Sequence, residues 1–254
     1  MRPPRVEVIG VTGIPIVKPG DDIPRLIVEA AERQGTPIQD GDIVVVSHII
    51  VSRAEGRIVN LNTVKPSKFA ENIAETLGKD PRLVEVILRE SRSIVRMGDG
   101  HLITETKHGF VCANSGVDQS NVPGEGFVAL LPEDPDESAR RIREGIEKLT
   151  GRRVAVVVSD THGRPLRDGE INVAIGVSGL KPIRDRRGER DLFGYVLKVK
   201  RTAVADEIAS AAELVVGQAD EGVPAAIVRG YRFEWSEEAT ARELIMPRER
   251  DLFA

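Results

Sequence analysis

Hydrophobic and polar positions change period several times along the chain, which predicts a mixture of strands and helices. Residues 40–52, 154–159 and 223–229 contain consecutive apolar positions, a pattern typical of strands buried on both faces. In residues 22–34 the apolar side chains recur at helical spacing, and Gly35 ends the run. The same rules predict further helices at 67–77, 81–90, 136–149 and 206–216, and further strands at 5–11, 93–97, 101–106, 109–113, 127–131, 171–179 and 195–204.

These elements favour one mixed domain. Strands and helices intermix without the regular βαβ spacing of a simple doubly wound sheet. We therefore expect an α/β fold of the mixed (α+β) kind, a single large domain over residues 1–254 with mixed sheets and two interlocked lobes. No repeat, low-complexity tract or linker divides the chain, and residues 231–254 are expected to form a peripheral tail.

Composition narrows the class of protein. The formal net charge of −4, without a basic tail, argues against a nucleic-acid binder, because phosphate neutralisation needs a basic face. A single cysteine, Cys112, leaves no intrachain disulfide or thiolate zinc site. No apolar stretch has the length of a signal peptide core or a membrane span, so we expect a cytoplasmic protein that does not engage a membrane.

Polar residues follow the Val-rich run that starts at residue 154, in the segment "SDTHGRPLRDG" (159–169). Asp160 and Thr161, at the expected end of this strand, carry the hard oxygen atoms that Mg²⁺ and Mn²⁺ prefer. Arg164 and Arg167 could hold phosphate or carboxylate groups in two-bond contacts. Taken alone, the segment favours an ordinary turn, with Ser159 or Asp160 bonding to nearby backbone.

A second polar cluster, "ANSGVDQSN" (113–121), follows another strand and brings a second carboxylate, Asp118. Its backbone N–H groups could face an anion, or the segment could be a surface turn. "SRAEGR" (52–57) fits a phosphate-facing loop or an exposed ion-paired turn, and Gly217 in "VVGQADEGVPAAIVRG" (215–230) fits a helix cap. Two strand-end acids favour a shared metal site of the kind that phosphoryl transfer requires.

Several familiar catalytic motifs are absent. The sequence has no G-x-x-x-x-G-K-[ST] loop, no G-x-S-x-G elbow and no H-E-x-x-H pair, and "DLFG" (191–194) is not preceded by the H-R-D loop of a kinase. The four histidines lack the spacing of metal ligands and are interpreted as structural or solvated: His48, His101, His108 and His162.

The order of these clusters resembles one family, the coenzyme F420-0:L-glutamate ligases, which are GTP-dependent γ-glutamyl ligases. The resemblance extends roughly over residues 6–230. It rests on "IVSRAEGR" (50–57), "ANSGVDQSN" (113–121), "SDTHGRPLRDG" (159–169), "NVAIGVSG" (172–179), "DLFG" (191–194), "ADEIASAAELVVGQ" (205–218) and "EGVPAAIVRG" (221–230).

The resemblance implies roles for individual residues. A divalent metal, Mg²⁺ or Mn²⁺, with a monovalent cation as a further option, would be held by Asp118, Asp160, Thr161 and Gln218. The implied catalytic residues are Asp118, Asp160 and Arg164. The implied GTP-binding residues are Ile14, Pro15, Ile16, Val17, His48, Ile49, Arg53, Asn121, Gly217, Gln218, Ala219, Asp220, Glu221 and Gly222. The family often has lysine at the position of Arg53 and asparagine at that of His162, so this chain departs from the pattern there.

The resemblance also implies an activity. The acceptor carboxylate of coenzyme F420-0 would take the γ-phosphoryl group of GTP, and the amine of L-glutamate would attack the acyl phosphate, with further γ-linked additions as an extension. It implies a homodimer, the commonest oligomer. The alternatives are a ligase for a folate- or pterin-type acceptor, and a metal-dependent phosphohydrolase or nucleotide-sensing module that shares the site.

Overall fold

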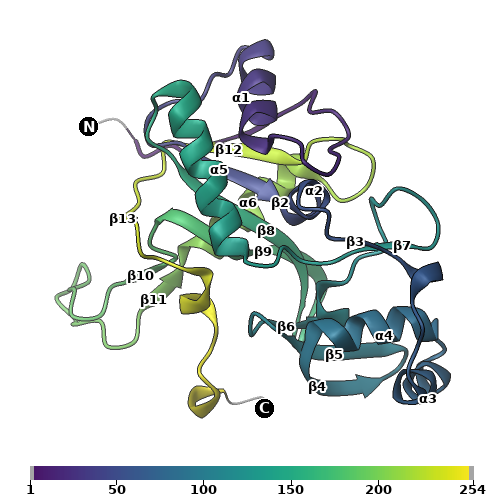
Figure 1. The fold of residues 1–254 in the computed structure, drawn as a ribbon. Helices are drawn as coiled ribbons and strands as arrows, with labels where there is room; N and C mark the ends of the chain where they lie inside the picture. Colours follow the sequence, from purple (N-terminus) through teal and green to yellow (C-terminus); the bar gives the residue numbers. More distant parts are fainter. Residues whose placement is uncertain (1–2, 252–254) are drawn as a thin grey trace.

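The computed structural model describes residues 3–251, and its centre is a six-stranded sheet (Figure 1). β2 and β8 run parallel, and the other neighbouring strands in this sheet are antiparallel. The mixed α/β architecture predicted from the sequence is confirmed, and the strand directions differ from those of a doubly wound sheet. In spatial order the strands are β1 (Glu7–Gly10), β12 (Ala225–Arg229), β2 (Ile43–Ser47), β8 (Ala155–Arg164), β9 (Arg167–Leu180) and β13 (Trp235–Ser236).

Helices cover both faces of this sheet (Figure 1). Successive residues of β2 and β8 point to opposite faces, so Val44 and Val156 pack in one core cluster and Val45 and Val157 in another. Helices α1 (Ile23–Arg33) and α5 (Pro135–Thr150) supply apolar side chains to the first cluster, and α6 (Val204–Val216) to the second. The consecutive apolar positions in the sequence therefore reflect a sheet that is buried on both sides.

A second lobe, with its own core, is inserted between α2 (His48–Ala54) and α5. The lobe packs helices α3 (Lys68–Leu77) and α4 (Pro81–Glu90) against a three-stranded sheet of β4 (Ser91–Gly98), β5 (His101–Thr106) and β6 (Val111–Ala113). The chain enters through β3 (Ile58–Asn60) and leaves through β7 (Phe127–Ala129), and these two strands pair with each other. The lobe lies at the lower right of Figure 1.

Two predicted strands are strands over only part of their length. The run 40–52 is a strand only to Ser47, and the chain then turns into helix α2, where Ile50 and Val51 are buried on one side. A short apolar run does not distinguish a strand from a buried helix, which explains this error. Of the predicted strand 195–204, β11 (Arg201–Ala203) pairs with β10 (Ile183–Asp185), and most of the rest is an exposed loop.

The predicted strand at residue 154 is longer than expected. β8 continues to Arg164 in a hairpin with β9, so Asp160 and Thr161 lie inside a strand and not at its end. Ser159, Asp160, Thr161 and His162 line the pocket from this ladder, and the chain turns only at residues 165–166.

The segment 231–254 is expected to be a peripheral tail; residues 252–254 lie outside the described residues, and part of 231–251 contributes to the domain. β13 pairs with the end of β9, and Ala239 and Ala241 are buried in the core cluster around α6. Arg143 and Arg153 stack on the ring of Trp235, which further attaches this segment to the domain.

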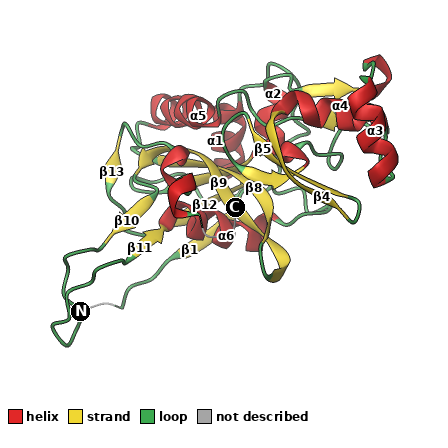
Figure 2. Cartoon of the chain, turned by 90° about the horizontal axis from the view of Figure 1, so that it is seen from below, coloured by secondary structure: helices red, strands yellow, loops and turns green. Residues whose placement is uncertain are grey.

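Residues 186–200 between β10 and β11 form an arm that extends away from the rest of the domain (Figure 2). Leu192 and Phe193 at its end are 99% and 97% exposed. Within residues 3–251, no helix combines the length and apolar character needed to cross a membrane.

Candidate active site

A pocket of about 480 Å³ opens at the carboxyl end of β2, beside the middle of β8. Because these strands are parallel and in register, Ser47 and Ser159 lie side by side at this edge, and His48 and Asp160 follow them into the pocket. The open edge beyond the carboxyl ends of parallel strands is where α/β proteins commonly bind ligands. The loop after β6, the start of α2 and the loop after α6 form the other walls.

The Asp160 carboxylate has three polar partners in the pocket. Its Oδ1 lies 3.1 Å from Nε2 of His48 and accepts the backbone N–H of Thr161 at 2.8 Å, and its Oδ2 lies 3.1 Å from Nε2 of His162. Burial by itself would raise the pKa of Asp160, but the two imidazoles outweigh this effect and hold the pKa well below its usual range. The carboxylate is therefore ionised although it is 8% exposed.

The two histidines respond in the opposite direction. Burial lowers the pKa of His162, whereas hydrogen bonds to Asp160 and Cys112 raise it more, and the net result is a pKa of about 10. Burial also lowers the pKa of His48, but Asp160 and then Asp118 raise it, so that it lies above its ordinary value. Nδ1 of His48 is buried and has no hydrogen-bond partner among the described residues.

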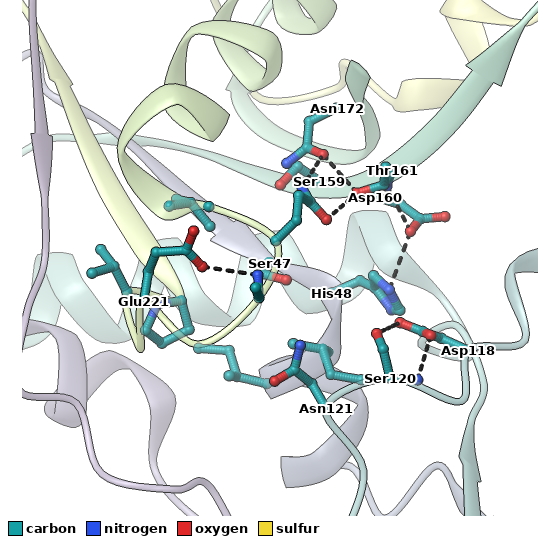
Figure 3. A pocket seen from close by; sticks show the side chains of 18 of the residues that line it. Ser47, His48, Asp118, Ser120, Asn121, Ser159, Asp160, Thr161, Asn172 and Glu221 are labelled. Atoms are coloured by element: carbon teal, nitrogen blue, oxygen red, sulfur yellow. Dashed lines mark hydrogen bonds and ion pairs between the residues drawn. The ribbon is translucent and has the colours of Figure 1, made fainter. Parts of the chain in front are cut away.

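Asp118 lies in the loop after β6 and approaches His48 from that side. Figure 3 shows the His48 ring between the carboxylates of Asp160 and Asp118. Its backbone N–H and C=O both pair with Ala129, at 2.9 and 2.8 Å. Its carboxylate accepts the backbone N–H of Ser120 at 2.7 Å and the Ser120 hydroxyl at 2.8 Å. These bonds fix the position of the carboxylate before any ligand binds.

The turn before Asp118 has an unusual backbone. Asn114, Ser115 and Gly116 all have positive φ angles, of 53°, 54° and 67°. Such a conformation is costly for the first two residues and persists only where surrounding contacts hold it. The Ser115 hydroxyl bonds to the hydroxyls of Ser91 and Thr104, each at 2.6 Å, and so anchors the turn to the second lobe.

Thr161 and Gln218 meet at the third side of the pocket, together with Asn172 from β9. Oγ1 of Thr161 lies 2.8 Å from Oδ1 of Asn172 and 3.0 Å from Oε1 of Gln218. Nε2 of Gln218 donates to the same Oδ1 of Asn172 at 3.1 Å. Figure 3 shows Thr161, Asn172 and Asp160 on one wall.

Arg53 lies near the mouth of the pocket, at the end of α2, where it donates a hydrogen bond to the backbone carbonyl of Asn121. Burial lowers the pKa of Arg53, but a guanidinium stays protonated in proteins. The pocket thus presents a guanidinium and two imidazoles beside two carboxylates.

The structure brings most of the residues expected from the sequence to this one pocket. The residues that line it are Ile14, Pro15, Ile16, His48, Ile49, Arg53, Asp118, Asn121, Asp160, Thr161, Gly217, Gln218, Ala219, Glu221 and Gly222. Val17 and Asp220 are not among the lining residues. Arg164, expected to be catalytic, also lies outside the lining: its Nη2 donates to the carbonyls of Asp168 and Gly169 and so closes the tip of the β8–β9 hairpin.

The sequence did not predict a role for Asn172 or the place of His162 in the pocket. Asn172 appeared inside a strand-like segment and in the motif "NVAIGVSG" (172–179), and its position opposite Thr161 depends on the pairing register of β8 and β9. His162 was interpreted as structural or solvated, whereas its ring bonds to Asp160 inside the pocket. A polar residue in an otherwise apolar strand was the available signal for Asn172.

The oxygen atoms in the pocket suit a hard divalent cation. No group of three or more His, Cys, Asp and Glu side chains within residues 3–251 forms a metal cage. Mg²⁺ seldom needs one, because it commonly binds through one or two carboxylates and completes its shell with water and substrate phosphate. The 3.0 Å between Thr161 Oγ1 and Gln218 Oε1 matches the spacing of about 3 Å between adjacent ligands in an octahedron with bonds of about 2.1 Å.

The fold and the pocket together define a mixed α/β protein with a pocket lined by acidic and basic side chains at the edge of its main sheet. The chain belongs to the F420-0:gamma-glutamyl ligase family, whose sequence model matches residues 12–230. It is 53% identical over 249 residues to the coenzyme F420:L-glutamate ligase of Methanothermobacter thermautotrophicus, covering 98% of each chain.

Two further relatives carry the same name. The coenzyme F420:L-glutamate ligase of Methanopyrus kandleri is 51% identical over 242 residues, covering 93% of each chain. That of Archaeoglobus fulgidus is 41% identical over 248 residues, covering 98% of this chain and 96% of the relative. The similarity therefore includes both lobes and the whole pocket.

Proposed function

We propose that this protein is a GTP- and divalent-metal-dependent ligase that joins L-glutamate to coenzyme F420-0 by an amide bond and adds further γ-linked glutamates. The name shared by its full-length relatives supports the acceptor and the amino acid. The observation that carries the proposal is the arrangement of Asp118 and Asp160 on opposite sides of His48 in the pocket. Two fixed carboxylates beside cationic side chains suit the binding of a metal–triphosphate.

Asp118, Asp160, Thr161 and Gln218 would hold Mg²⁺ or Mn²⁺, and the same pocket leaves room for a monovalent cation as a further ligand. When bound, the divalent ion supplies positive charge to the oxygens of the transferring phosphoryl group. Asp160 is suited to this task because the two histidines keep it ionised. Asp118 is suited to it because its backbone is clamped to Ala129.

Cationic side chains would hold the phosphates of GTP. His48 and Arg53 line the pocket at the start and end of α2, and Nδ1 of His48 lacks a partner within the described chain. The backbone at 14–16 and 217–222 would line the guanine base. We propose GTP and not ATP as the nucleotide because the family that the sequence resembles is GTP-dependent.

The reaction would proceed in two transfers. An acceptor carboxylate oxygen would form a bond to the γ-phosphorus while the β–γ bridging bond breaks and GDP leaves. The amine of glutamate would then attack the acyl carbon, losing a proton as inorganic phosphate departs. Arg53 and the two histidines would stabilise the negative charge that accumulates on the phosphate oxygens in both steps.

We further propose a homodimer located in the cytoplasm. Leu192 and Phe193 at the end of the arm are almost fully exposed, and basic side chains outnumber acidic ones along residues 184–201. Exposed apolar side chains gathered on a projection are typical of a contact with another protein chain. A two-fold dimer is the commonest symmetric arrangement for such a contact.

Purified protein incubated with GTP, Mn²⁺, L-glutamate and F420-0 tests the proposal when products are weighed by mass spectrometry. We expect a mass increase of one or more glutamyl residues, with GDP and phosphate released only when both co-substrates are present. Hydrolysis of GTP that neither substrate affects would instead indicate a phosphohydrolase, and binding without turnover a sensor. Ligation to a folate but not to F420-0 would overturn the acceptor alone.

A further inference from the structure

Asn172 occupies its position in the pocket because of a bulge in the central hairpin. Val158 pairs with Gly176 and Ser159 with Ala174, so Ile175 is an extra residue on β9. This bulge shifts the pairing by one residue and places Asn172 directly opposite Thr161. Without it, regular alternation would pair Asn172 with His162.

Helix α6 holds this part of β9 from behind. The Ser210 hydroxyl donates to the backbone carbonyl of Asn172 at 2.8 Å, and Asp206 accepts the backbone N–H of Ala174 at 2.9 Å. Asn172 is 4% exposed, so its side-chain amide has little access to water. The structure thus fixes both the backbone and the surroundings of this amide.

The Thr161 hydroxyl cannot donate to both of the amide oxygens that contact it. The hydroxyl has one hydrogen, yet two amide oxygens lie within hydrogen-bond distance, on Asn172 and Gln218. If Asn172 accepts the hydroxyl hydrogen, Oγ1 of Thr161 and Oε1 of Gln218 face each other at 3.0 Å with lone pairs alone. Two such oxygens at this distance are favourable when both bind one cation.

We propose that Asn172 is a positioning residue of the metal site: its Oδ1 accepts the Thr161 hydroxyl and one N–H of Gln218, which directs the remaining lone pairs of Thr161 Oγ1 and Gln218 Oε1 toward a divalent cation. This inference rests on the proposed metal dependence. Residues behind a metal ligand act in this way by setting the orientation of the ligand.

The test measures Mn²⁺ binding to protein free of nucleotide, from the loss of the free-Mn²⁺ signal in electron paramagnetic resonance. Asn172→Leu, similar in size but without an acceptor, should weaken binding by about 10–100-fold. Asn172→Asp keeps the acceptor oxygen, replaces the NH2 group by a second one, and should bind at least as tightly as the native protein. Asn72→Leu, an exposed site on α3, should leave binding unchanged.

A double variant separates positioning from a general structural effect. If Asn172 acts through Thr161, then Asn172→Leu should weaken binding far less in a Thr161→Val background than in the native protein. In assays of the whole reaction, excess Mn²⁺ should restore the kcat of Asn172→Leu. Should Asn172→Leu fail to fold, Asn172→Ala carries the same expectation without added bulk.

The outcomes distinguish this inference from the proposed function. Native Mn²⁺ affinity in a folded Asn172→Leu protein, or full additivity with Thr161→Val, would overturn the role of Asn172 alone. A native protein that fails to bind Mn²⁺ would overturn both the metal dependence and this inference. A protein that binds Mn²⁺ as expected but ligates nothing would overturn the ligase and leave Asn172 in place.

Discussion

Nε2 of His48 lies 3.1 Å from Oδ1 of Asp160, in a pair whose side chains are both less than one-tenth exposed. The pair joins the first residue of α2 to the middle of β8, and it keeps a carboxylate ionised within the protein. Asp118 faces the same imidazole from the loop after β6. The charge of the pocket is therefore set by side chains from three separate parts of the chain.

Loss of either carboxylate should abolish metal-dependent turnover. We expect Asp118→Asn and Asp160→Asn each to lower kcat/KM by more than about 100-fold, since even residues behind a metal ligand typically cost about 10–100-fold. Steady-state assays with Mn²⁺ measure the effect, and circular dichroism shows whether the fold is kept. Near-native activity in both variants would refute the assignment of the site.

The protonated state of His162 should make the stability of the metal-free protein depend on pH. Its folded pKa of about 10 lies above the ordinary value of 6.5. The stability it contributes is therefore complete below pH 6.5 and is lost as the pH rises through 10. With EDTA present, the difference in Tm between native protein and His162→Asn should shrink steadily from pH 6.5 to 10. A difference that stays constant over this range would contradict the prediction.

GTP should stabilise the protein more than ATP. With Mn²⁺ present and nucleotide at about 100 times its Kd, the expected gain in unfolding free energy is about 2.7 kcal/mol. Thermal unfolding with each nucleotide measures it, and Mn²⁺ alone serves as the control. Equal shifts in Tm for GTP and ATP would remove the claim of guanine preference.

The arm should be required for dimer formation. Replacing Leu192 and Phe193 together by serine removes two nearly fully exposed apolar side chains, so a dimer seen by light scattering should dissociate to monomer. Leu166→Ser is the matched control, because Leu166 is 90% exposed at the tip of a different hairpin. A native protein that is monomeric at working concentration would refute the dimer itself.

Gly176 should be needed for the close approach of α5 to β9. A Cβ atom at this position would lie 2.2 Å from the backbone carbonyl oxygen of Pro135, which cannot move aside as a flexible side chain can. We expect Gly176→Ala to lower the unfolding free energy by about 1–3 kcal/mol, as overpacking does. Denaturant unfolding measures it, with Gly98→Ala as the control, since nothing lies within 4 Å of a Cβ there. Equal stability of the two variants would contradict this account.

The sequence by itself determined the class of fold and the set of polar segments that meet in the pocket. The runs Val44 to Val46 and Val156 to Val158 are apolar at every position, and a sheet covered on both sides buries them, so the local pattern was sufficient. The polar segments that follow these and other strands could be named from residue type and order before any contact between them was known. They include the residues Asp118, Asp160, Thr161 and Gln218.

The tertiary structure alone decided which groups face one another. The partnership of Asn172 with Thr161 depends on one extra residue in β9, and the enclosure of Asp160 by His48 and His162 depends on strand pairing and on a turn into α2. Arg164 was expected in the pocket because it belongs to the same polar segment as Asp160, but its side chain bonds to the tip of the hairpin instead. Residue type and order are local properties, whereas register, burial and pKa arise from contacts between segments far apart in the chain, and only the folded protein contains those contacts.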